Sequence, residues 1–291
     1  MTDAFILTLS CPDRAGIVHA VTGVLAEHGA NITEAAQFND QSTGLFFMRM
    51  RFDCTASADT TDTTDTNAAD RLRERFTALA ATLQMRWGLH STRDRVPTVI
   101  MVSKLGHCLN DLLFRCRSQP LPLDIRAIVS NHRDFYQLAA SYDIPFHHIP
   151  VTANNKAQAE AKLLDIVAHE KCELVVLARY MQVLSNDVCR ALEGRAINIH
   201  SFLPSFKGAK PYQQAFDRGV KTIGATAHYV TGDLDEGPII EQDTVRADHA
   251  MDTAQLTAIG RDVESAVLAR AVMWHAERRV LVNGSKTVVF K

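Results

Sequence analysis

The sequence lacks several features that mark whole classes of protein. No apolar run approaches the about 18 residues that a membrane-spanning helix needs, and the N-terminus has no basic stretch followed by an apolar one. No stretch is dense in lysine or arginine, and the formal net charge is −2, which argues against nucleic acid as the main partner. We therefore expect a cytoplasmic protein that binds neither a membrane nor nucleic acid.

The cysteine pattern excludes a disulfide framework. The chain has no C-x-x-C pair, and its cysteines do not cluster with other metal ligands in the sequence. We expect reduced, mostly buried thiols and no metal site. The six positions are Cys11, Cys54, Cys108, Cys116, Cys172 and Cys189.

What is present suits two globular domains. The chain has 291 residues, of which 46% are hydrophobic and 22% charged. Residues 1–90 predict a ferredoxin-like β-α-β-β-α-β unit, with strands at 5–10, 30–38, 44–52 and 84–90 and helices at 17–28 and 71–83. Within it, residues 53–70 repeat Asp-Thr-Thr with almost nothing apolar, so we expect a flexible insert there.

Residues 91–97 are polar and end at Pro97, and we interpret them as a linker. From 98 to 291 strands alternate with helices, which predicts crossover units and a Rossmann-like, mostly parallel sheet. The last helix is expected over about 252–281, where apolar residues recur every three or four positions.

The strand "AINIH" ends on two polar side chains that share a face. Successive strand residues alternate, so Asn198 and His200 point one way, about 7 Å apart, while Ile197 and Ile199 point the other. Ligands of open α/β sheets bind at the carboxyl ends of strands. The strand therefore predicts a functional site at its end.

A loop further along carries three carboxylates between Gly232 and Gly237. Asp235 lies in it, although aspartates also serve turns simply by bonding their own backbone. An amide, an imidazole and a carboxylate together supply a donor, an acid/base group and an anion. The adjacent pair His147-His148 is a weaker metal candidate, because neighbouring strand residues face opposite ways.

The spacing N-I-H, L-P, a glycine, then H-Y-V-x-x-x-L-D-x-G-P-I resembles the formyltetrahydrofolate-dependent formyltransferase superfamily. The resemblance implies that Asn198, His200 and Asp235 are the catalytic trio and that "LARYMQVLS" (177–185) contacts the pterin, largely through backbone groups. Gln182 stands where many relatives carry arginine. The implied folate-binding residues are Met181, Gln182, Leu184, Val230, Thr231, Gly232 and Gly237.

The segment "LSCPDRAGIVHAVTGVLAEHGANI" resembles an ACT domain, a module that binds amino acids and pairs between subunits. This implies a homo-oligomer, a dimer or a tetramer, with glycine or methionine as effector. A purely structural dimerisation module is the alternative. The candidate effector residues lie in the turns 13–16 and 29–31 and are Asp13, Arg14, Gly16 and Asn31.

An ACT domain ahead of such a catalytic domain resembles the formyltetrahydrofolate deformylase family, an enzyme family of one-carbon metabolism and purine biosynthesis. The implied reaction is hydrolysis of 10-formyltetrahydrofolate to tetrahydrofolate and formate, with Asp235 activating water and His200 and Asn198 stabilising the tetrahedral intermediate. No metal or cofactor is expected. Formyl transfer to an amine is the alternative, but "VSKLGHCLNDL" has one glycine, Gly106, and lacks a glycine-rich phosphate cradle.

Overall fold

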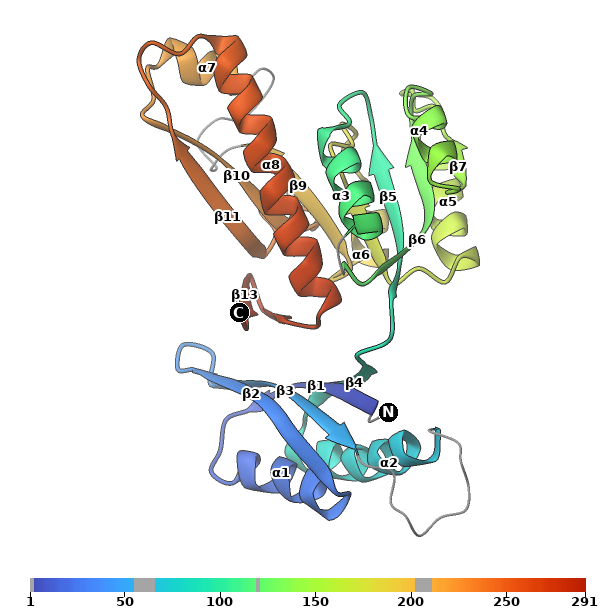
Figure 1. Ribbon diagram of the computed structural model, residues 1–291, viewed down its shortest axis with the longest axis vertical. Coiled ribbons are helices and arrows are strands. Elements are labelled where there is room, and N and C mark those ends of the chain that lie inside the picture. The colour runs from blue at the N-terminus through green and yellow to red at the C-terminus, as the bar shows by residue number, and fades with distance from the viewer. Residues whose placement is uncertain (1–2, 55–65, 119–120, 202–210) are drawn as a thin grey trace. The chain divides into compact units, whose positions relative to one another are not determined.

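The computed structural model describes residues 3–54, 66–118, 121–201 and 211–291, and the chain divides into two compact units (Figure 1). The first unit is Met1–Asp94 with two short C-terminal segments, Glu277–Leu281 and Val288–Lys291. The second is Arg95–Ala276 with Val282–Thr287.

The first unit is the expected ferredoxin-like β-α-β-β-α-β fold. Its antiparallel sheet has the order β2-β3-β1-β4, and α1 and α2 lie on one face of it (Figure 1). Alternate strand residues such as Leu7 and Phe52 meet Val21 and Phe76 of the helices in a buried core. The elements are β1 (Asp3–Pro12), α1 (Ile17–Glu27), β2 (Ala30–Asp40), β3 (Leu45–Cys54), α2 (Thr66–Leu83) and β4 (Arg86–Ser91).

Both ends of the expected flexible insert, 53–70, belong to regular elements in the structure. β3 continues through Cys54, and α2 already begins at Thr66 rather than at Arg71. The remaining residues, 55–65, lie outside the described residues.

The C-terminus differs from the expected helix over 252–281 and from a second domain that continues unbroken to 291. Helix α8 (Thr253–Ala276) ends before Arg278, whose φ of 56° is incompatible with a continued right-handed helix. A hairpin of β12 (Val280–Asn283) and β13 (Lys286–Val289) follows. Val288 and Phe290 pack against the fully buried Phe47, on the face of the first sheet opposite its helices, which explains why these residues join the first unit.

The second unit contains the predicted mostly parallel sheet, with strand order β11-β10-β9-β8-β5-β6-β7. Five strands are parallel, and at one edge β10 pairs antiparallel with β9 and β11 pairs antiparallel with β10. Because Ser91 belongs to β4 and β5 starts at Val96, the expected linker 91–97 is reduced to 92–95. The strands are β5 (Val96–Val102), β6 (Leu123–Ser130), β7 (Phe146–His148), β8 (Leu174–Leu177), β9 (Ala196–Ser201), β10 (Thr222–Tyr229) and β11 (Ile239–Arg246).

Helices cover this sheet on both faces. Val99 and Val175 pack with α5 and α6 on one face, and their neighbours Ile100 and Val176 are fully buried on the other. Helix α8 lies along β9, β10 and β11 and contacts α3 (Figure 1). The remaining helices are α3 (His107–Ser118), α4 (Tyr136–Ser141), α5 (Lys156–His169), α6 (Asn186–Ala191) and α7 (Pro211–Asp217).

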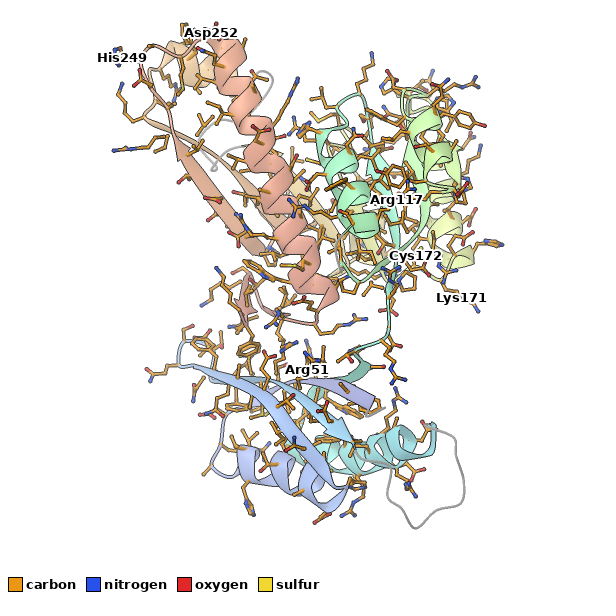
Figure 2. The ribbon with its side chains drawn as sticks, viewed as in Figure 1. Arg51, Arg117, Lys171, Cys172, His249 and Asp252 are labelled. Carbon is orange, nitrogen blue, oxygen red and sulfur yellow. The ribbon has the colours of Figure 1, made fainter. Side chains whose placement is uncertain are left out.

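All six cysteines are free thiols, and four of them are buried. Burial raises the pKa of Cys108 to about 12 and that of Cys172 to about 11, so both are protonated at neutral pH. Figure 2 labels Cys172 beside Lys171, in the turn between α5 and β8. Within the described ranges, no helix combines the length and the apolar character needed to cross a bilayer.

Candidate active site

The end of β9 carries the polar pair that the sequence predicts. Asn198 and His200 are half-buried on one face, whereas Ile197 and Ile199 are buried on the other. The antiparallel neighbour β10 places His228 directly opposite Asn198. A second imidazole therefore joins the pair.

Asp235 reaches this strand end from the loop between β10 and β11. Its backbone is left-handed, with φ of 58°, a conformation that aspartate tolerates better than most residues. The loop closes tightly because the Tyr229 N–H donates to the Pro238 carbonyl at 2.9 Å. At Gly237 a Cβ atom would lie 1.7 Å from the Tyr229 carbonyl oxygen, so only glycine fits.

The four side chains form one connected group. The Asn198 amide donates to Asp235 Oδ1 at 3.2 Å and approaches His228 Nε2 at 3.4 Å. His200 Nε2 lies 3.3 Å from Asp235 Oδ2, and His228 Nε2 lies 3.7 Å from Asp235 Oδ1. The carboxylate is thus flanked by an amide and two imidazoles.

The tautomer of His228 follows from its backbone partner. His228 Nδ1 lies 2.9 Å from the Tyr229 carbonyl, which can only accept, so Nδ1 carries the proton. In the neutral ring Nε2 is then the acceptor for the Asn198 amide, whereas in the imidazolium ring Nε2 carries a proton and faces the Asp235 carboxylate as a donor. His228 thereby orients Asn198.

The environment keeps Asp235 ionised. The polar contact with His228 contributes most to lowering the pKa of Asp235 below its ordinary value, although burial acts in the opposite direction. The charges of His200, His228 and Arg179 lower this pKa further. Asp235 is therefore available at neutral pH as a proton acceptor.

These groups face a cavity of about 440 Å³. Six of the seven expected folate-binding residues line it: Met181, Gln182, Leu184, Val230, Thr231 and Gly232. The exception is Gly237, which does not line the cavity but permits the tight loop return described above. Further lining residues lie in the expected segment 177–185 and in the loop 230–235, namely Arg179, Tyr180, Val183, Asp233 and Leu234, whereas His228 was not expected there.

Two family models match this architecture: residues 96–272 match the Formyl transferase model and residues 5–80 the ACT domain model. The formyltetrahydrofolate deformylase of Corynebacterium sp. (strain P-1) is 50% identical over 98% of both chains. The chain belongs to the formyltetrahydrofolate deformylase family.

Solved structures of relatives agree with this assignment. The crystal structure of formyltetrahydrofolate deformylase from Burkholderia mallei ATCC 23344 is 51% identical, with a TM-score of 0.93 over 99% of this chain and 100% of that one. The phosphoribosylglycinamide formyltransferase of Coxiella burnetii is 29% identical, with a TM-score of 0.62 over 67% of this chain and 94% of that one. The deformylase family thus shares its second unit with a formyltransferase.

In this deformylase-family chain, the segment after β8 is held in place by Ser103. The Ser103 hydroxyl accepts the Met181 N–H at 2.9 Å and donates to Asn131 Oδ1 at 2.7 Å, and the Ser103 N–H donates to the Arg179 carbonyl at 3.2 Å. These bonds fix one wall of the cavity.

Behind that segment lies a second polar group, centred on Glu264 of α8. Tyr212 donates to Glu264 Oε1 at 2.7 Å, His107 Nε2 lies 2.7 Å from Oε2, and Arg179 Nε lies 3.5 Å from Oε2. Burial acts to raise the pKa of Glu264, but the His107 hydrogen bond, the Arg179 charge and the Tyr212 hydroxyl outweigh it and leave this pKa below its ordinary value. Glu264 is therefore a buried anion.

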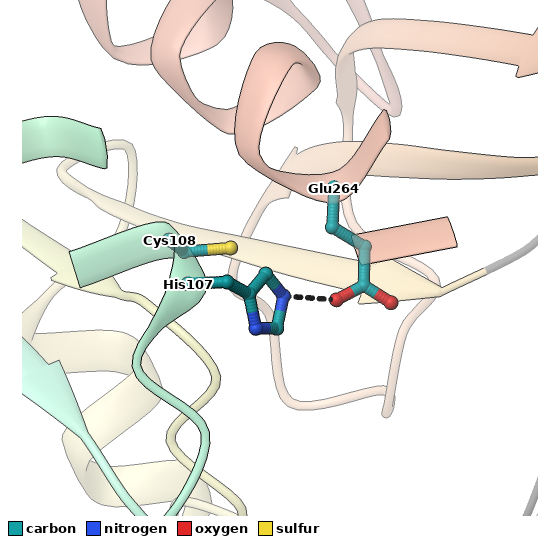
Figure 3. Close-up of side chains that lie close together, drawn as sticks. All are labelled: His107, Cys108 and Glu264. Atoms are coloured by element: carbon teal, nitrogen blue, oxygen red, sulfur yellow. Dashed lines mark hydrogen bonds and ion pairs between the residues drawn. The ribbon is translucent and has the colours of Figure 1, made fainter. Parts of the chain in front are cut away.

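This cluster also contains the one set of possible metal ligands found among the described residues. Figure 3 shows His107, Cys108 and Glu264 converging, with their ligand atoms within 4.8 Å of one another. No sequence pattern indicates this set, because Glu264 is 157 positions from His107 in the chain. Both Glu264 oxygens already have partners, Cys108 is protonated and the Arg179 cation lies close by, so the donor set does not fit a cation.

The candidate effector residues are not brought together within one chain. Pro12, next to Asp13, pairs with Leu45 at the start of β3, whereas Asn31 pairs with Asp53 near its end. These ends are about 27 Å apart at ordinary strand rise. Arg14 donates to the Leu83 carbonyl at 3.0 Å, and Asp13 accepts a hydrogen bond from Asn39. Each turn stands alone in the first unit.

Proposed function

We propose that this chain hydrolyses 10-formyltetrahydrofolate to tetrahydrofolate and formate. The observation that carries the proposal is the ionised Asp235, within 3.3 Å of His200 and 3.2 Å of Asn198, facing a 440 Å³ cavity. The names of the relatives described above support the same reaction.

Asp235 is the general base of the proposed mechanism. Its Oδ atoms hold a water molecule against the formyl carbon, and the carboxylate takes one water proton as the new C–O bond forms. Collapse of the tetrahedral intermediate breaks the bond between carbon and N10, and N10 receives a proton through His200. Formate leaves as an anion at neutral pH, so one proton is released in each turnover.

Asn198 and His200 stabilise the oxyanion. The Asn198 amide bonds to Asp235 and His228 are long, at 3.2 and 3.4 Å, so a developing negative charge competes well for its N–H groups. One such donor is worth roughly 3–4 kcal/mol in comparable acyl-transfer sites. Asp235 and His200 carry out the proton transfers of the mechanism. We propose that the reaction uses no metal and no cofactor.

The substrate pterin binds between the segment after β8 and the loop before Asp235. Met181 and Leu234 line the cavity and are about three-fifths exposed, at 60% and 61%, which leaves apolar surface for a flat heterocycle. Gln182 supplies an amide on the same wall. Backbone groups of this segment remain the proposed hydrogen-bonding partners of the pterin.

Water is the proposed acceptor rather than an amine-bearing phosphate ester. At Gly106 a Cβ atom would lie 2.3 Å from the Phe135 ring, so this glycine serves packing and not a phosphate cradle. Formyl transfer to an amine remains the second candidate, because the second unit resembles a formyltransferase.

An acceptor-free assay separates the two candidates. Purified protein is incubated with 10-formyltetrahydrofolate alone, and formate and tetrahydrofolate are measured over time. We expect the two products in a 1:1 ratio, at a rate that glycinamide ribonucleotide does not increase. Formate that appears only with an added amine would establish transfer instead.

For the first unit we propose that an amino acid, glycine or methionine, regulates the rate. The ACT domain match supports this, and the separation of the two candidate turns requires that one turn suffices or that two copies of the chain contribute. Titration of each amino acid against rate, melting temperature and molecular mass tests it. An unchanged rate and melting temperature would leave the unit a structural module.

A further inference from the structure

A second cavity, of about 410 Å³, adjoins the proposed catalytic cavity. The two share Arg179 and Pro211 as lining residues, so the Arg179 side chain stands in the wall between them. The second cavity is lined both by buried residues such as Tyr212 and Glu264 and by the exposed residues Arg261 and Gln213. The second cavity therefore leads from Arg179 to the surface.

Arg179 is a largely buried cation that forms no hydrogen bond with the residues that the structure describes. Its side chain is only 11% exposed, yet no hydrogen bond engages the guanidinium among the described residues, and its buried Nε has no partner within hydrogen-bonding geometry. The ion pair to Glu264, at 3.5 Å, is its nearest charge contact. Buried N–H donors without partners are rare in folded proteins and indicate a missing water or ligand. Arginine presents a fork that matches a carboxylate in two parallel hydrogen bonds.

The rest of the second cavity also favours an anion. Thr253, Thr257 and Gln213 contribute hydroxyl and amide groups, and Arg261 adds a cation that forms no ion pair with any described residue. The one carboxylate in the lining, Glu264, is already bonded on Oε1 by Tyr212 and on Oε2 by His107. Positive charge thus lies both at the largely buried Arg179 and at the exposed Arg261 of the cavity lining.

We propose that this cavity is the exit site for the carboxylate product, which binds first at Arg179 and leaves past Arg261. The inference rests on the proposed function, because hydrolysis turns a neutral formyl group into an anion beside the ionised Asp235. Like charges repel, and Arg179 is the cation that lines both cavities. A separate exit lets formate leave while tetrahydrofolate still fills the first cavity.

Product inhibition by sodium formate tests the exit site. Initial rates of tetrahydrofolate formation are measured against formate at constant ionic strength, set with sodium chloride, and at several folate concentrations. We expect noncompetitive inhibition against the folate, because the two products occupy different cavities.

Variants of two arginines, Arg261 and Arg179, locate the binding. Arg261→Gln, on the exposed rim, should keep the formate-free rate and weaken formate inhibition by about twofold to fivefold, as an exposed charge does. Arg179→Gln should weaken it by about tenfold or more, because a charge-assisted bond is lost, and Arg179→Lys by less. Arg270→Gln is the matched control on the same helix, since Arg270 pairs with Asp243 and lines neither cavity.

The outcomes separate this inference from the proposed function. Formate inhibition that is purely competitive with the folate, or unchanged in Arg261→Gln, overturns the exit site even if the wild-type protein releases formate normally. Wild-type protein that releases no formate from 10-formyltetrahydrofolate refutes the proposed function itself. The Arg261→Gln result decides the matter even if Arg179→Gln fails to fold.

Discussion

The two units each bury an arginine, and the two arginines differ in how their donors are used. Arg49 of the first unit is 2% exposed, pairs with Glu34 at 2.7 Å and donates twice to the Glu277 carbonyl, at 3.3 and 3.1 Å. Arg179 of the second unit is 11% exposed and has one ion pair within the described part of the chain, at 3.5 Å. A buried charge whose donors are satisfied holds the fold, whereas one with spare donors lines a cavity and is available to a ligand.

The same contrast separates two carboxylates of the second unit, Glu264 and Asp235. Glu264 is 1% exposed, with hydrogen-bonding partners on both oxygens, and Asp235 is 29% exposed at the wall of the first cavity. The pKa of each lies below its ordinary value. The greater exposure of Asp235, at the wall of the first cavity, lets a water molecule reach its carboxylate, and this difference assigns the chemistry to Asp235.

After removal of Asp235 itself, the largest effect on the rate is expected from removing either of the two side chains that contact Asp235, Asn198 or His200. Asn198→Ala and His200→Ala should each lower formate release by at least about a hundredfold, because each removes a donor to the oxyanion. Melting temperatures should hardly change. His169→Ala is the control and should leave the rate unchanged, because it removes an imidazole that is 85% exposed, at the C-terminal end of α5. A similar loss in the control would mean that the assay reports folding rather than chemistry.

The next effect concerns stability and belongs to the first unit. Glu34→Gln leaves Arg49 buried beside Arg279 without a carboxylate partner, and should lower the free energy of unfolding by about 2 kcal/mol. This loss is smaller than that for breaking a fully buried ion pair, because the Glu277 carbonyl still accepts a hydrogen bond from Arg49. Urea unfolding measures it. Glu27→Gln, in the exposed pair with Arg75, is the matched control and should cost less than about 1 kcal/mol. Equal losses would contradict the assigned role of Arg49.

The Glu34 pair also predicts a pH dependence with a definite sign. Burial acts to raise the pKa of Glu34, but Arg49 and Arg279 outweigh it and lower this pKa below its ordinary value. Its stabilisation is therefore present above the pKa of the unfolded chain and is lost as the pH falls through the folded-state pKa. Wild type and Glu34→Gln should converge in stability in acid. A constant difference down to low pH would remove this ion pair from the explanation.

The smallest effect is a shift of the pH profile. His228→Asn removes the group that contributes most to lowering the pKa of Asp235, so this pKa should rise. Since the base acts only when ionised, the acidic limb of kcat/KM should move to higher pH, while the rate on the plateau falls less than in His200→Ala. An acidic limb that stays in place would show that His228 does not act on Asp235.

The sequence predicts the parts of this structure that depend on short-range patterns. Strand alternation at 196–201 puts Asn198 and His200 on one face, and helical spacing identifies α1 and α8. Period and turn chemistry are local properties, so they are readable without tertiary contacts. Asp235 is likewise recognisable in the sequence, because it lies in a polar loop between Gly232 and Gly237.

Other features depend on contacts between distant residues. Glu264 meets His107 across 157 positions, and nothing in the local pattern of α8 distinguishes it from a solvated glutamate. His228 is opposite Asn198 only because β10 pairs antiparallel with β9 in that register. The C-terminal hairpin was missed because its strands have four residues each and follow a long helix without proline or glycine at the break.

The most direct test of the central claim is formate release by Asp235→Asn, measured together with folate binding. The variant keeps the size of the side chain but cannot accept the water proton. We predict that formate release falls by about a thousandfold while the protein still binds tetrahydrofolate. Turnover close to that of the wild type would contradict the assignment of Asp235 as the base, and with it the mechanism built on this site.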